Sequence, residues 1–120
     1  MAAGASTISD AARSVSYIEE ISPQLRGCAI LTEDGEALAA SGDVDAWAAP
    51  ARELVAAIDS VGGEPAAHAH ISTPDGEAFC VREAGLVAVA VGERLTLASL
   101  MIFDLRSVLR DLAAGTPPAG

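Results

Sequence analysis

Apolar residues recur at helical spacing in three stretches of the chain, which predict three helices. The first stretch is Ile8–Ile21, and Pro23 should end it because proline disfavours helix at the preceding residue. The second is Asp43–Val61, which contains Pro50. Since proline is tolerated only in the first turn, this helix should either begin near Ala46 or kink at Pro50. The third stretch covers Leu97–Leu112.

Five further stretches predict strands. They are Gly27–Thr32, Glu36–Ser41, Ala66–Thr73, Glu77–Glu83 and Leu86–Val91. The first pair is joined by Glu33-Asp34-Gly35 and the next pair by Pro74-Asp75-Gly76, within the near-identical stretches TEDGEA and TPDGEA. Each turn is expected to be a three-residue hairpin loop with its glycine in the left-handed conformation. A metal or phosphate loop is the alternative, although each turn offers little more than one Asp-Gly pair.

The last strand is apolar on both faces, which is typical of a strand in the middle of a covered sheet. The predicted order is therefore α-β-β-α-β-β-β-α, with helices on both faces of a mainly antiparallel sheet. The expected fold class is α/β in the broad sense, and α+β in the narrower sense because the strands are mainly antiparallel. A length of 120 residues allows one domain. We expect this domain over residues 8–113, with a flexible segment at 1–7 and a disordered tail at 114–120.

The chain is strongly acidic, with a net charge of −10 and no lysine. Nucleic acids and anionic membranes are bound mainly through basic side chains, so both are poor candidates for partners. Cys28 and Cys80 are too few for a disulfide framework, which favours a reducing cytoplasm. The N-terminal residues lack a signal-peptide pattern. The longest apolar run is far shorter than the ~20 residues of a membrane span.

Two stretches carry a resemblance to a known family. Arg26–Gly42 reads RGCAILTEDGEALAASG, and Phe103–Arg106 reads FDLR. The first resembles the initial hairpin, and the second the last helix, of the roadblock family. This family comprises dynein light chains of the roadblock type and bacterial regulators of small Ras-like GTPases. The resemblance implies a five-stranded sheet of order 2-1-5-4-3, with the outer helices on one face and the middle helix on the other.

The resemblance also implies a function. Family members dimerise through their third strands and middle helices, have no enzymatic activity or cofactor, and serve as platforms for a small GTPase. We therefore expect a homodimeric platform with a GTPase-activating or docking role. The alternative is an adaptor subunit of a larger complex without a GTPase. The expected interface residues are Trp47, Arg52, Leu54, Val55, Ile58, His68 and His70.

Two of these residues have a simpler explanation. Trp47 lies on the apolar stripe of the middle helix and is either a core residue or an interface anchor, since tryptophan is enriched at binding hot spots. Arg52 is either a solvated helix residue or a contact to the partner.

A minor alternative is a metal or thiol site on the second hairpin. If Thr73 pairs with Glu77, then His68, His70 and Cys80 point to the same face. Two imidazoles and a thiolate suit zinc, and a cysteine beside a histidine suits nucleophilic catalysis. No fourth ligand or oxyanion pocket is evident, however. The simpler interpretation is a buried cysteine, with both histidines on the sheet face beneath the middle helix or at the strand edge.

Overall fold

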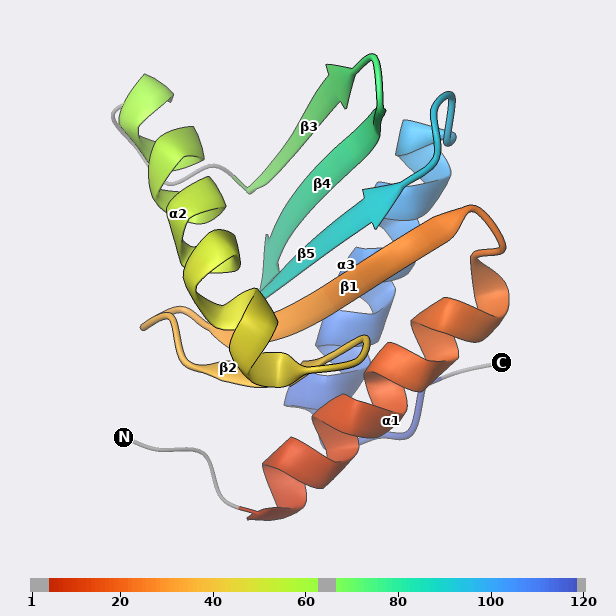
Figure 1. Cartoon of the computed structure of the whole chain (residues 1–120). Coiled ribbons are helices and arrows are strands. Elements are labelled where there is room, and N and C mark those ends of the chain that lie inside the picture. The colour runs from red at the N-terminus through yellow and green to blue at the C-terminus, as the bar shows by residue number, and fades with distance from the viewer. Residues whose placement is uncertain (1–4, 63–66, 119–120) are drawn as a thin grey trace.

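The chain follows the predicted order of helices and strands (Figure 1). A computed structural model describes residues 5–62 and 67–118. The elements are α1 (Ala5–Ile21), β1 (Leu25–Thr32), β2 (Ala37–Ala40), α2 (Val44–Gly62), β3 (His68–Thr73), β4 (Gly76–Glu83), β5 (Leu86–Gly92) and α3 (Ala98–Ala113). Across the described residues, no helix combines the length and the apolar character needed to cross a membrane.

The five strands form one antiparallel sheet in the order β2-β1-β5-β4-β3, which confirms the expected fold and topology. Its middle strand, β5, pairs with β1 on one side and β4 on the other. Val87 through Ala90 are buried in this strand. Because both faces of β5 are covered, its continuous apolar run is accounted for.

Helices cover both faces of the sheet. Residues of α1 and α3, such as Ile18 and Leu105, pack on one face against Ile30, Phe79 and others. On the other face, α2 packs against Ala29, Leu31, Cys80, Val87 and Val89. Figure 1 shows α2 and α3 on opposite sides of the sheet.

Several element ends differ from the predictions. Helix α1 begins at Ala5, so part of the segment expected to be flexible is helical, while residues 1–4 lie outside the described part. Helix α2 begins at Val44, two residues before Ala46, and Pro50 lies inside it. Residue 66, expected in the third strand, lies outside the described residues. Of the expected tail, residues 114–118 are described, and the Thr116 amide donates to the Asp111 carbonyl at 2.9 Å.

The first hairpin turn is the predicted three-residue loop. The Thr32 amide donates to the Glu36 carbonyl at 2.9 Å, and the Gly35 amide donates to the Thr32 carbonyl at 3.0 Å. Gly35 has a φ of +94°, the left-handed conformation that glycine adopts without strain.

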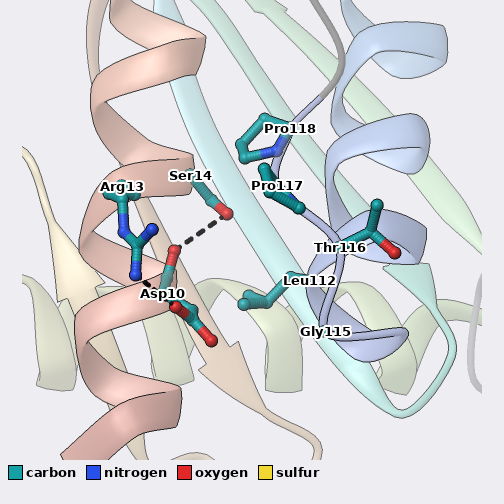
Figure 2. A pocket seen from close by; sticks show the side chains of 8 residues that line it. All are labelled: Asp10, Arg13, Ser14, Leu112, Gly115, Thr116, Pro117 and Pro118. Atoms are coloured by element: carbon teal, nitrogen blue, oxygen red, sulfur yellow. Dashed lines mark hydrogen bonds and ion pairs between the residues drawn. The ribbon is translucent and has the colours of Figure 1, made fainter.

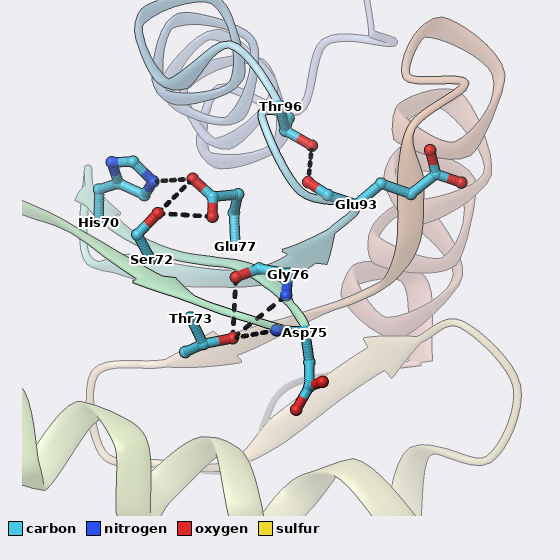
Figure 3. Close-up of polar contacts among 8 residues, drawn as sticks. All are labelled: His70, Ser72, Thr73, Asp75, Gly76, Glu77, Glu93 and Thr96. Carbon is cyan, nitrogen blue, oxygen red and sulfur yellow. Dashed lines mark hydrogen bonds and ion pairs between the residues drawn. The ribbon is translucent and has the colours of Figure 1, made fainter.

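The prediction for the second hairpin turn was wrong by one residue. Thr73 pairs with Gly76 and not with Glu77, so the loop contains only Pro74 and Asp75. Thr73 Oγ1 accepts from the Asp75 amide at 3.2 Å and from the Gly76 amide at 3.1 Å, which closes the tighter loop (Figure 3).

Gly76 is also not left-handed, unlike Gly35. A Cβ placed on Gly76 would lie only 2.5 Å from the carbonyl oxygen of Gly92 in β5. Glycine is therefore needed here because two backbones approach closely, and not because of a special φ angle.

Candidate functional site: the α2–β3 surface

Strand β3 forms an open edge of the sheet, because it pairs only with β4. The Arg82 amide donates to the Ala67 carbonyl at 2.8 Å, which fixes the hydrogen-bonding phase of this pair. Bonded and non-bonded pairs alternate in an antiparallel ladder. The backbone N–H and C=O groups of His68, His70 and Ser72 therefore point away from β4, on the unpaired side of β3.

Exposed apolar side chains are found on the α2 side of the sheet, on β3 itself and at the end of α2. Ala69 pairs with Cys80, whose side chain packs under α2, so Ala69 and Ile71 belong to that face. Ile71 is 38% exposed, and Val61 at the end of α2 is 88% exposed. We call Val61, Ala69, Ile71 and the outward backbone of β3 the α2–β3 surface.

Three of the predicted interface residues, Leu54, Val55 and Ile58, are half-buried on α2. They pack against the core beneath the helix, which includes Leu31 and Val89. Their exposed parts leave a strip of apolar surface along α2 that continues to Val61.

Trp47 and Arg52 both make contacts within the chain. The indole N–H of Trp47 donates to the Ser41 carbonyl at 3.0 Å, and its ring lies against Gly27, where a Cβ would be 2.7 Å away. Arg52 donates from Nη1 to the Gly35 carbonyl at 3.1 Å. These contacts hold α2 on the first hairpin and account for both residues through packing.

His70 belongs to a polar network that the sequence analysis missed. Its Nε2 lies 2.9 Å from Glu77 Oε1, and Ser72 Oγ donates to both oxygens of that carboxylate at 2.8 and 2.7 Å (Figure 3). The His70 ring stacks on Phe79, with centroids 4.7 Å apart. The Glu77 side chain is only 7% exposed.

These residue types resemble a catalytic triad, but their arrangement differs. The carboxylate of Glu77 sits between the other two groups, and the Ser72 hydroxyl donates to it and not to the imidazole. An activated serine needs its base at the hydroxyl. The bonds from Ser72 and His70 stabilise the charged carboxylate and lower the pKa of Glu77 below its usual value. The network thus stabilises the β3–β4 pair.

The structure contradicts the proposed metal or thiol site. With the observed register, His68 and His70 pair with Val81 and Phe79, while Cys80 pairs with Ala69 on the opposite face. The one-residue shift in the turn moves the histidines to the other side of the sheet from the thiol. Both imidazoles therefore lie on the α3 side and not beneath the middle helix.

The surroundings of these groups agree with that correction. Burial raises the pKa of the Cys80 thiol. His68 Nδ1 lies 3.5 Å from Arg106 Nη2 of α3. Among the residues that the structure describes, no three histidine, cysteine, aspartate or glutamate side chains are grouped to hold a metal ion.

An ion pair on the α2 side was also missed. Arg82 of β4 donates to both carboxylate oxygens of Asp59 in α2, at 2.8 and 2.6 Å. It borders a cavity of about 250 Å³ between α2 and the first hairpin turn, with Leu31, Val55 and Val87 among its apolar lining. The guanidinium and carboxylate bind each other, and the turn residues Glu33 and Asp34 also line the cavity.

A second cavity, of about 240 Å³, lies between α1 and the segment that follows α3 (Figure 2). Its polar groups also bind one another: Arg13 pairs with Asp10 at 2.7 Å, and Ser14 Oγ donates to the Asp10 carbonyl. Pro117 and Pro118 line its other side. These lining residues do not suggest a catalytic or binding site.

The fold is similar to those of several solved bacterial proteins. MglB from Myxococcus xanthus is 11% identical, with a TM-score of 0.73 over 95% of this chain and 92% of that chain. The gliding protein MglB from Thermus thermophilus is 16% identical, with a TM-score of 0.69 over 97% and 96%. A Roadblock/LC7 domain from Streptomyces avermitilis is 17% identical, with a TM-score of 0.65 over 87% and 92%.

No protein-family model and no curated protein sequence matches the chain. The likeness is therefore one of structure, and it extends over nearly the whole chain and nearly the whole of each similar protein. The strand order β2-β1-β5-β4-β3, the covering helices and these matches together establish that the chain has the Roadblock/LC7 fold.

Proposed function

We propose that this protein is a non-enzymatic homodimer whose paired α2–β3 surfaces form a platform for a small Ras-like GTPase. The observation that carries the proposal is the open edge of β3, which bears the exposed residue Ile71, together with the exposed Val61 at the end of α2. The GTPase follows from the family resemblance of Arg26–Gly42 and Phe103–Arg106. The similarity in fold to MglB and to a Roadblock/LC7 domain supports that resemblance.

An unpaired edge strand favours association with another strand, which supports the dimer. Pairing two copies of β3 would satisfy the outward backbone groups of His68, His70 and Ser72. It would also remove Ile71 from water, and burial of apolar area contributes roughly 25 cal/mol per Å². One solved MglB is described as a tetrameric arrangement, so a protein of this fold does assemble with its own copies.

The chemistry of the described residues supports a binding role. The Ser72 hydroxyl donates to Glu77, and the Arg82 guanidinium is held by Asp59, so neither is poised toward a bound molecule. Cys28 and Cys80 are free thiols and both are buried. Unpaired thiols favour a reducing compartment, and we propose that the protein acts in the cytoplasm.

Capture of partners from a lysate of the source organism tests the GTPase role. Immobilised protein is incubated in buffer with GDP or with a non-hydrolysable GTP analogue, and bound proteins are identified by mass spectrometry. We expect a small GTPase to be retained in one nucleotide state, and to be lost with Ile71→Arg. Ala113→Arg, at an exposed position at the end of α3, is the matched control and should retain the GTPase.

The adaptor role is the alternative outcome. If neither nucleotide yields a GTPase, and the same set of other proteins is captured in both buffers, the GTPase role is wrong. The platform would then serve a larger complex instead.

A further inference from the structure

A second exposed apolar surface lies at the start of α3, away from the α2–β3 surface. Leu95, Leu97, Leu100 and Phe103 are each more than half exposed. They fall within the nine-residue stretch Leu95–Phe103, which runs from the β5–α3 loop through the first turns of α3. Among the described residues, they make up half of the large apolar side chains that are exposed. We call these four residues the α3 patch.

Leu95 is held in an unfavourable conformation within this patch. Its φ of +66° is in the left-handed region, yet its side chain is 84% exposed. A non-glycine residue there costs roughly 1–2 kcal/mol, and leucine has no side-chain hydrogen bond to offset that cost. The turn is fixed by Thr96 Oγ1, which donates to the Glu93 carbonyl at 2.6 Å (Figure 3). The loop thus presents a leucine to solvent at an energetic cost.

Next to the patch is a small hollow between α1 and α3. Its volume is about 50 Å³, and Ile21, Leu97, Leu100 and Met101 form its apolar walls. Asp104 also lines it. Burial raises the pKa of this carboxyl. No hydrogen bond or ion pair joins the Asp104 carboxylate to any other residue in the described ranges, 5–62 and 67–118.

The electrostatic potential is also negative where α1 lines the hollow. Ile21 is the last residue of this helix, so the hollow adjoins the helix C-terminus, where the backbone dipole is negative. The last turn of α1 contains no basic residue, and Glu19 and Glu20 are exposed there. Two basic residues are close to the hollow in sequence. Arg94, which precedes Leu95, helps to lower the pKa of Glu77. Arg106, two residues after Asp104, lies 3.5 Å from Glu83 Oε1.

We propose that the α3 patch and the Asp104 hollow together dock an amphipathic helical segment of a partner protein that carries basic side chains. Its apolar face would cover Leu95, Leu100 and Phe103. One lysine or arginine would lay its aliphatic stem in the hollow and pair with Asp104. A second copy paired through the same patch is a poorer occupant, because it would bring the two negative Asp104 hollows together.

Two synthetic peptides test this proposal. One is an amphipathic helix of leucine and lysine, and the other replaces every lysine with glutamate. Binding is measured by fluorescence anisotropy of the labelled peptide, and the contact surface is mapped by backbone amide NMR shifts. We expect the lysine peptide to bind, with shifts centred on Leu95–Asp104 and Ile21, and the glutamate peptide not to bind.

Variants identify the contacts. Asp104→Asn should weaken binding of the lysine peptide about tenfold, the effect of one charge-assisted bond of roughly 1.4 kcal/mol. Phe103→Ser should weaken it by at least that factor. Asp75→Asn, in the exposed β3–β4 turn, is the charge-matched control, and Ile71→Ser is the apolar control. Both should leave the affinity unchanged.

Three results would overturn the proposal: equal binding of both peptides, shifts centred on α2 and β3, or self-association of the protein through the α3 patch. The proposal is independent of the GTPase platform, since its residues lie on the other side of the sheet. Ile71→Arg, which tests that platform, should leave peptide binding intact.

Discussion

Substitution of Gly76 tests the register of the second hairpin, on which the rejection of a metal or thiol site depends. In the structure, a Cβ on Gly76 would lie 2.5 Å from the Gly92 carbonyl oxygen and 2.9 Å from Arg26 Nη1. The arginine side chain can move aside, but the carbonyl belongs to the backbone of β5 and cannot move without disturbing the ladder. Overpacking of this kind costs about 2–3 kcal/mol.

Gly76→Ala should therefore lower the melting temperature by about 10 °C. Gly76→Asn should cost at least as much, because its side chain is larger and the backbone there is not left-handed. The matched control is Gly85, which has a φ of +82° and no atom within 4 Å of an added Cβ. At this position asparagine, which tolerates the left-handed conformation, should be less costly than alanine.

Urea unfolding measures all four variants. It is followed by the fluorescence of Trp47, the single tryptophan, at one protein concentration so that any association is held constant. A Gly76→Asn variant more stable than Gly76→Ala would refute the reasoning. That order is the signature of a left-handed glycine and would restore the register with Thr73 opposite Glu77.

Three further predictions concern groups with perturbed surroundings. The lowered pKa of Glu77 contributes stability that is complete above its usual pKa of 4.5 and is lost as the pH falls through the lower folded value. Glu77→Gln should therefore reduce the loss of unfolding free energy between pH 6 and pH 3 (about 1.5 units either side of 4.5), measured by urea unfolding. An unchanged loss would exclude the network as its cause. Burial raises the pKa of Cys28 to about 11 and also raises that of Cys80. Both thiols should therefore react with Ellman's reagent at neutral pH only after the protein unfolds. Fast labelling of the native protein would contradict this. Ala84 has a φ of +54° in the β4–β5 turn, so Ala84→Gly should raise the unfolding free energy by about 0.5–1 kcal/mol, whereas a loss of stability would show that the turn is not strained.

The architecture could be predicted because its signals are local and repeated. Apolar spacing identified the three helices, and the run Leu86–Val91, apolar on both faces, indicated the central strand. The sheet order came from the family resemblance and agrees with that run.

The register of β3 could not be predicted, for two physical reasons. The two Asp-Gly turns look alike, but the Thr73 hydroxyl closes a loop one residue shorter than the first. Strand β3 is also an exposed edge, where five of six side chains are exposed, so no apolar pattern distinguishes its faces. With the correct register, Ser72 opposite Glu77 would have suggested the polar network.

The role of the expected interface residues stays a prediction. Leu54, Val55 and Ile58 do lie half-buried on α2, but Trp47 and Arg52 are engaged within the chain. Val61 and Ile71 were identified by the exposed fractions of their side chains in the folded chain. The α3 patch depends on the φ angle of Leu95 and on the approach of α1 to α3. None of these quantities can be read from residue order.

Amide hydrogen exchange along β3, measured residue by residue by NMR at a concentration where the protein is associated, tests the central claim most directly. The backbone amides of His68, His70 and Ser72 point away from β4, whereas those of Ala69 and Ile71 face it. If two copies pair through β3, all five amides should be protected, and Ile71→Arg should release the three outward ones selectively. If the outward amides exchange freely while Ala69 and Ile71 stay protected, the edge of β3 is open in solution and the dimeric platform is wrong.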